Sequence, residues 1–133
     1  ISQNIYSILL TIFHSIFHEK EQLAVDPKME FISKVSAYVN NNLYGRITLH
    51  DLAEQANLST CHFCRVFSKY FGVTPVKYVL SKKVEISKYL LSCTNEPLSS
   101  IASSLGFSDQ SHFSKVFKSF ESKSPLHFRK TSR

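Results

Sequence analysis

Apolar side chains recur at helical spacing along most of the chain, and no run shows the sustained alternation of apolar and polar positions that marks a strand. In residues 97–117 these positions form two short stripes that meet at Gly106. Two short helices joined by a tight corner make a helix-turn-helix. We expect Gly106 to take the positive φ that such a corner requires, and Ser108 to cap the second helix through its side-chain oxygen.

The corner occurs twice in the sequence. Asn57 stands where the second copy has Gly106, and asparagine tolerates positive φ better than most residues. The offset between the copies is 49 residues before the second helix and 50 within it, so the second copy has one extra residue at its corner. The other matched pairs are Leu52 and Ile101, Ala53 and Ala102, Ser59 and Ser108, Phe63 and Phe113, Phe67 and Phe117, and Pro75 and Pro125.

A 19-residue helix from Pro75 to Cys93 is predicted between the two copies, starting at Thr74 as its N-cap. Its apolar positions, Val76 among them, are expected to be buried in patches. At 1.5 Å per residue it is roughly 28 Å long. Successive turns of the DNA major groove lie about 34 Å apart on one face, so a stiff rod of this length could place two helices in adjacent grooves.

Residues 1–21 are predicted to form a helix whose apolar stripe is wider than a single lobe would cover. We interpret it as an interaction helix that pairs with a second copy or docks on a domain outside this sequence; packing on the chain's own C-terminal body is the alternative. A break at residues 24–28 precedes a helix over residues 29–43. The first residue is Ile, which predicts a piece of a longer protein.

These patterns predict an all-α protein: two helix-turn-helix subdomains joined by a long linker helix, about seven helices in all, preceded by the N-terminal interaction helix. The expected division is into residues 1–27, the N-terminal helix and linker, and residues 28–133, which contain both helix-turn-helix units. The latter divides into a first lobe (28–73), the linker helix (74–93) and a second lobe (94–133).

Charge is distributed unevenly. Residues 1–27 hold one lysine and three acids, whereas residues 28–133 hold 15 Lys and Arg against seven acids. A basic body of this size predicts a polyanionic partner, and the acidic residues 19–27 disfavour a membrane surface. Three cysteines without a signal peptide indicate a reduced, cytosolic chain. Catalytic motifs are absent from the sequence, so we expect neither an enzyme nor a cofactor nor a metal site.

The second copy resembles the AraC/XylS family of bacterial transcription regulators, and the resemblance covers residues 28–133. It rests on LGFSDQSHFSKVFK followed by KSPLHFRK, and in the first copy on Leu52-Ala53, Ser59, Arg65, Phe67, Phe71-Gly72 and Thr74-Pro75. The resemblance implies that residues 28–133 are a monomeric, two-lobed DNA-binding domain attached to a sensing or dimerising domain. It also implies that residues 1–27 are the helix and linker from the end of that missing regulatory or dimerisation domain. Four positions depart from the family: Lys83 replaces Arg, Ser87 replaces Ala, and Glu121-Ser122 replace an aromatic–glycine pair, so that the second helix C-cap loses its glycine.

The residues expected to touch DNA follow from how a helix-turn-helix docks, with its second helix in the major groove. Arg65 and Lys115 can pair with guanine and Gln110 with adenine, although Arg65 and Lys115 could serve phosphate instead. The base-contacting candidates are Thr60, Cys61, Cys64, Arg65, Gln110, Ser111, Ser114 and Lys115. The phosphate-contacting candidates are cations or helix starts, namely Arg46, Thr48, Lys69, Thr74, Lys77, Lys118, Lys123, Ser124 and Arg129.

Two further features of the sequence, His112 and the Cys61–Cys64 pair, have competing interpretations. His112 is expected to be partly buried beside Phe113 or to lie near the backbone. Cys61 and Cys64 form a lone C-x-x-C, which more readily makes apolar contacts to thymine methyl groups than a metal or redox site.

The sequence therefore predicts a sequence-specific transcription regulator of the bacterial cytoplasm and nucleoid. Its expected output is activation, its partners are double-stranded DNA, RNA polymerase and a second copy of the chain, and the alternative is an architectural or repair-associated nucleic-acid-binding module.

Overall fold

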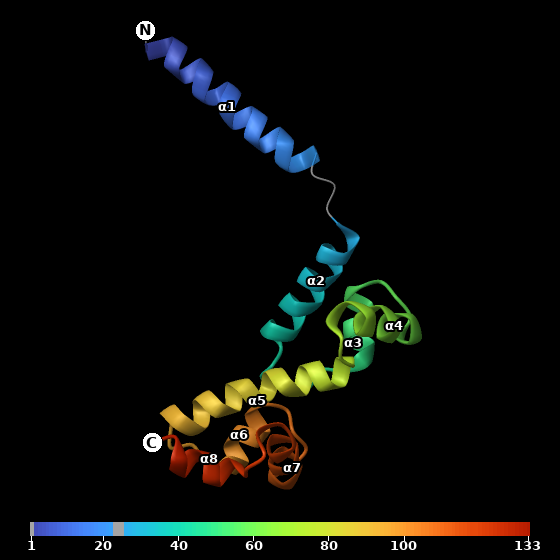
Figure 1. Cartoon of the computed structure of the whole chain (residues 1–133), viewed down its shortest axis with the longest axis vertical. Coiled ribbons are helices and arrows are strands. Elements are labelled where there is room, and N and C mark those ends of the chain that lie inside the picture. Colours follow the sequence, from blue (N-terminus) through green and yellow to red (C-terminus); the bar gives the residue numbers. More distant parts are fainter. Residues whose placement is uncertain (1, 23–25) are drawn as a thin grey trace. The chain divides into compact units, whose positions relative to one another are not determined.

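The computed structural model describes the backbone of residues 2–22 and 26–133, and the side chains of residues 5–16 and 26–133. Within these ranges every regular secondary-structure element is an α-helix, which confirms the all-α prediction (Figure 1). The helices are α1 (Ser2–Gln22), α2 (Pro27–Asn41), α3 (Leu49–Gln55), α4 (Thr60–Phe71), α5 (Pro75–Cys93), α6 (Leu98–Ser104), α7 (Gln110–Glu121) and α8 (Pro125–Thr131). The bounds of α5 are those predicted, whereas α2 begins and ends two residues before the predicted bounds.

The chain forms two parts, Ile1–Glu30 and Phe31–Arg133. In the first part, α1 exposes a broad apolar surface: Ile5, Ile8, Leu9, Ile12, Phe13 and Ile16 are each 50–59% exposed. Of the predicted linker, residues 24 and 25 lie outside the described residues, as does residue 23. A search of the described residues finds no helix that is both long enough and apolar enough to cross a membrane.

The second part contains two hydrophobic cores, and α5 contributes buried side chains to both of them. Val79 belongs to the first core, with residues of α2, α3 and α4, and Val84 belongs to the second, with residues of α6 and α7. We call residues 31–73 the first lobe and residues 94–133 the second lobe. Figure 1 shows α3 and α4 near the start of α5. Helices α6 and α7 lie below the middle of α5 in this view and α8 lies below its C-terminal end, so both lobes share α5.

Backbone geometry confirms the internal repeat. Asn57 and Gly106 take positive φ of 54° and 76° at the two corners, and Gly72 and Ser122 take 74° and 64° after the second helices. Ser122 therefore forms the left-handed C-cap without glycine, and its N–H donates to the Lys118 carbonyl at 2.8 Å.

Two details of the sequence prediction are wrong. Asp109, not Ser108, caps α7. The extra residue of the second copy is Ser108 itself, which is inserted immediately before the cap. Val76 is 62% exposed, because Pro75 and Val79, one turn apart, face the core and turn Val76 outward.

Candidate nucleic-acid interface

The buried aromatic face of α4 determines which of its side chains face outward. Phe63 and Phe67 are fully buried, and the Phe67 ring stacks on Phe71 with centroids 4.1 Å apart. Tyr78 of α5 meets Phe67 edge-on at 5.5 Å. The helix is thereby fixed against α5 on one side. Cys61 and Arg65 lie on the opposite, exposed side, while Thr60 and Cys64 are half-buried at its margin.

In the second lobe, α7 repeats this arrangement. Phe113 and Phe117 are fully buried, with Phe107 5.3 Å from Phe113 and Phe128 of α8 5.5 Å from Phe117. Four candidates lie on the other side of the helix: Gln110, Ser111 and Lys115 are exposed, and Ser114 is half-buried. Each lobe thus presents one helix whose exposed face carries the predicted base-contacting residues.

His112 is exposed rather than partly buried, because the first turn of α7 extends beyond the core that Phe113 enters. Its Nδ1 lies 3.2 Å from Ser108 Oγ and its ring meets Phe107 edge-on at 5.4 Å. The inserted Ser108 therefore positions His112 at the start of α7.

We call α4 and α7, the second helices of the two helix-turn-helix units, the recognition helices. Their N-caps differ in charge. Ser59 Oγ accepts the His62 N–H at 3.3 Å at the start of α4, whereas Asp109 Oδ1 accepts the His112 N–H at 2.7 Å at the start of α7. The Asp109 carboxylate offsets the partial positive charge of the α7 N-terminus, and the neutral Ser59 hydroxyl leaves that of α4 in place. A phosphate is therefore better accommodated at the start of α4.

Among the helix starts proposed to hold phosphate, Thr74 at α5 is the best suited. Its Oγ1 accepts the Lys77 N–H at 3.3 Å, α5 has no acidic residue in its first turn, and Thr74 and Lys77 are both exposed. Ser124 caps α8 in the same way. Because proline occupies the first helical position of both helices, each site has one free N–H, that of Val76 or that of Leu126, beside nearby lysine charge.

Thr48 is less suited to an anion, although it caps α3. Thr48 and Asp51 form a capping box, in which the Thr48 N–H donates to the Asp51 carboxylate at 3.0 Å and the Asp51 N–H donates to Thr48 Oγ1 at 3.1 Å. Hydrogen bonds from the Thr48 side chain and backbone hold the pKa of Asp51 below its ordinary value. A carboxylate that stays ionised at this helix start repels a phosphate.

The cationic phosphate candidates do not all have free charges. Arg46, Lys69, Lys77 and Lys118 are exposed, and the half-buried Lys123 has its Nζ 5.4 Å from the centre of the Phe128 ring. Arg129, in contrast, donates from Nε to the Leu91 carbonyl at 3.2 Å and from a terminal nitrogen to the Glu96 carbonyl at 2.6 Å. Its guanidinium ties α8 to the end of α5, so we leave it out of the proposed interface.

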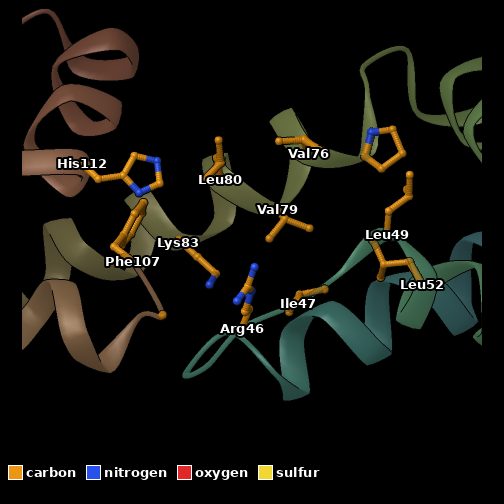
Figure 2. Close-up of a pocket in the computed structure, with 12 residues that line it drawn as sticks. Arg46, Ile47, Leu49, Leu52, Val76, Val79, Leu80, Lys83, Phe107 and His112 are labelled. Atoms are coloured by element: carbon orange, nitrogen blue, oxygen red, sulfur yellow. The ribbon is translucent and has the colours of Figure 1, made fainter. Parts of the chain in front are cut away.

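An apolar pocket of about 150 Å³ lies between the two lobes along α5 (Figure 2). Leu49 and Leu52 line it from the first lobe and Phe107 from the second, with Val76, Val79 and Leu80 between them on α5. Its polar lining is basic, from Arg46, Lys83 and His112, and Figure 2 shows Arg46 and Lys83 extending toward one another. Within the described residues, no three His, Cys, Asp or Glu side chains are grouped so as to hold a metal ion.

Two helix-turn-helix units that project recognition helices from one shared helix define a DNA-binding module. A family model described as "Helix-turn-helix domain" matches residues 52–131. The chain therefore belongs to this family of AraC/XylS-type helix-turn-helix domains.

Individual relatives share this region. The "Probable transcriptional regulator LumQ" of Photobacterium leiognathi is 33% identical over 95 residues, 71% of this chain and 38% of the relative. The "Bifunctional transcriptional activator/DNA repair enzyme AdaA" of Bacillus subtilis (strain 168) is 30% identical over 107 residues, 80% of this chain and 51% of the relative. The chain thus spans between about a third and a half of the length of these two curated relatives.

A solved structure shows the same fold. It is the DNA-binding domain of AdpA, a global transcriptional factor, in complex with a target DNA, with a TM-score of 0.72 and 24% sequence identity. The match covers 81% of this chain and 94% of that one.

Proposed function

We propose that this chain is the DNA-reading part of a transcription regulator and that α4 and α7 enter two adjacent segments of major groove. The observation that carries the proposal is the pair of recognition helices, each fixed by buried phenylalanines against the shared helix α5 and each exposing polar and basic side chains. The names of the two curated relatives support a regulatory output. Activation, with contact to RNA polymerase in the bacterial cytoplasm, is the output we propose.

In this proposal the exposed side chains of α4 and α7 read bases. Arg65 and Lys115 address guanine and Gln110 addresses adenine, while the smaller candidates contact neighbouring bases. Phosphates are held by Arg46, Lys69, Lys77, Lys118 and Lys123, and by the helix starts at Thr74 and Ser124.

A repair-associated role is the second candidate, because the name of the AdaA relative joins a transcriptional activator to a DNA repair enzyme. Binding selection from a random double-stranded DNA pool separates the two. Recovery of an asymmetric motif with two preferred patches about one helical turn apart supports the regulator. Binding that depends on salt but not on sequence rejects it in favour of the second candidate.

Substitutions in the two recognition helices should have effects confined to single base positions. Arg65→Ala and Gln110→Ala are each expected to cost about 1–3 kcal/mol of binding free energy on the selected site and to relax preference at one base pair. Lys118→Ala, which removes an exposed cation at the far end of α7, is expected to weaken all sequences alike. The measurement is a titration of each variant against the selected site and its single-base variants. A base-selective loss for Lys118→Ala would reverse its assignment.

The exposed apolar surface of α1 supports our proposal that this helix pairs two copies of the chain. Removal of residues 1–23 should then lower the apparent affinity for a DNA that carries two binding sites in inverted orientation. It should spare the affinity for a DNA with one site, because only linked binding depends on effective concentration. Sedimentation of both proteins and titration of both DNAs provide the measurement. Equal losses on the two DNAs would assign α1 to folding instead.

A further inference from the structure

Lys83 joins the two lobes at the middle of α5. It is 5% exposed, and its Nζ donates to the carbonyl of Gly45, 2.6 Å away in the loop between α2 and α3. The same Nζ donates to the carbonyl of Leu105, at the corner between α6 and α7. One ammonium group therefore bonds a carbonyl of each lobe, at the point where α5 changes from the first core to the second.

The chemistry of this contact favours a charged lysine in spite of its burial. Desolvation lowers the pKa of Lys83, but two carbonyl acceptors and the Phe107 ring, with its centre 5.8 Å from Nζ, favour the protonated form. If the ammonium were removed, both carbonyls would lose a charge-assisted hydrogen bond.

Gly106 lies in the same contact, and its positive φ is not the only reason why this position favours glycine. A Cβ atom on Gly106 would lie 2.2 Å from the Gly45 carbonyl oxygen and 3.0 Å from Lys83 Nζ. The matching corner of the first lobe has Asn57 at positive φ, so the corner itself does not require glycine. Gly106 therefore permits the close approach of the two lobes at Gly45.

None of the extensive helix contacts in this part of the chain pairs a helix of one lobe directly with a helix of the other, so the lobes are joined through α5. These contacts pair α3 with α4, α6 with α7 and α7 with α8, or they join α5 to α4, α7 and α8. Contacts of Lys83 and Gly106 with Gly45 are thus well placed to fix how one lobe is oriented relative to the other.

We propose that Lys83, Gly45 and Gly106 form a lock that sets the relative orientation of the two lobes and thereby the spacing of the two base patches that the protein reads. The proposal rests on the proposed function, in which α4 and α7 read one site together. Lys83 is a positioning residue in it. Each base pair inserted between the patches turns one patch by roughly 35° relative to the other, so a locked module tolerates few spacings.

The first experiment measures affinity for the selected site with its spacer shortened or lengthened by one or two base pairs, using the whole chain. Wild type should prefer one spacer by about tenfold or more, because a rigid connection has one optimal span. Lys83→Met should reduce that preference to within about threefold while keeping affinity for single patches. Lys83→Arg should keep the spacer preference of the wild type, since arginine can donate to both carbonyls. Lys82→Met removes a charge from the adjacent position and should leave it unchanged.

A matched pair of glycine substitutions tests the lock with Lys83 present. Gly106→Ala and Gly72→Ala both place alanine at positive φ, 76° and 74°, but a Cβ on Gly72 meets nothing within 4 Å. Only Gly106→Ala should broaden the spacer preference. Should Lys83→Met fail to fold, this pair decides. Equal spacer profiles for the two alanine variants would overturn the proposal.

A measurement without DNA separates failure of the lock from failure of the proposed function. Spin labels at Glu54 and Ser103, exposed and matched positions of α3 and α6, report the distance between the lobes after the three cysteines are replaced by serine. Lys83→Met should broaden the distance distribution, and Lys82→Met should not. Equal distributions would reject the lock. If wild type showed no two-patch site, the proposed function would fail while this distance measurement still decided the lock.

Discussion

Phe67→Ala and Phe117→Ala should each lower the free energy of unfolding by about 3–5 kcal/mol, the range for a large buried side chain truncated to alanine. Both rings are fully buried at matched positions of the two repeats. Phe67 loses a stacked contact to Phe71 at 4.1 Å and an edge contact to Tyr78 at 5.5 Å. Because domains of this size are stabilised by about 5–15 kcal/mol, either change removes a large fraction of the total.

Urea denaturation followed by circular dichroism measures this effect, and Tyr89→Ala provides the control. Tyr89 is 66% exposed on α5, and its loss should change stability by at most about 0.5 kcal/mol. Both phenylalanine variants should also bind every DNA sequence more weakly, because the core orients the recognition helices. A loss below about 1 kcal/mol for Phe67→Ala would contradict the packing described for α4.

Much of this fold could be predicted from the sequence, because it is determined by local signals. The 3.6-residue periodicity, the proline after Thr74 and the paired corners at Asn57 and Gly106 each act within one or two turns of helix. Their consequences, a 19-residue α5 and positive φ at both corners, appear in the structure. The buried phenylalanines were predictable for the same reason, and they leave the candidate base-contacting residues on the outer face.

The features that could not be predicted depend on residues distant in sequence or on a single insertion. Lys83 contacts Gly45, 38 positions earlier, and Arg129 contacts Leu91, 38 positions earlier. No periodicity relates such pairs, so the sequence marks Lys83 only as a departure from the family and predicts a phosphate contact for Arg129. The position of the α7 N-cap depends on where the extra residue of the second repeat is inserted. Pairing Ser59 with Ser108 predicts the cap at Ser108, one position before the observed Asp109.

Binding to DNA should weaken steeply with salt, which is the second large effect we expect. The proposed interface contains five cations, Arg46, Lys69, Lys77, Lys118 and Lys123. Each phosphate neutralised on duplex DNA contributes about −0.9 to the slope of log affinity against log salt concentration, so five give a slope of about −4.5. Between 50 and 200 mM salt the affinity should then fall about 500-fold. Fluorescence anisotropy of a labelled duplex over this range provides the measurement.

Single substitutions show which charges contribute to that slope. Lys77→Ala should reduce its magnitude by about 1, because an exposed cation at the start of α5 loses its phosphate. Lys82→Ala is the control on the same helix: Lys82 is half-buried, its Nζ lies 3.8 Å from Glu85, and its loss should leave the slope unchanged. Arg129→Ala should also leave the slope unchanged, because its guanidinium bonds two carbonyls of the chain. A slope that fell for Arg129→Ala but not for Lys77→Ala would return Arg129 to the interface and remove the start of α5 from it.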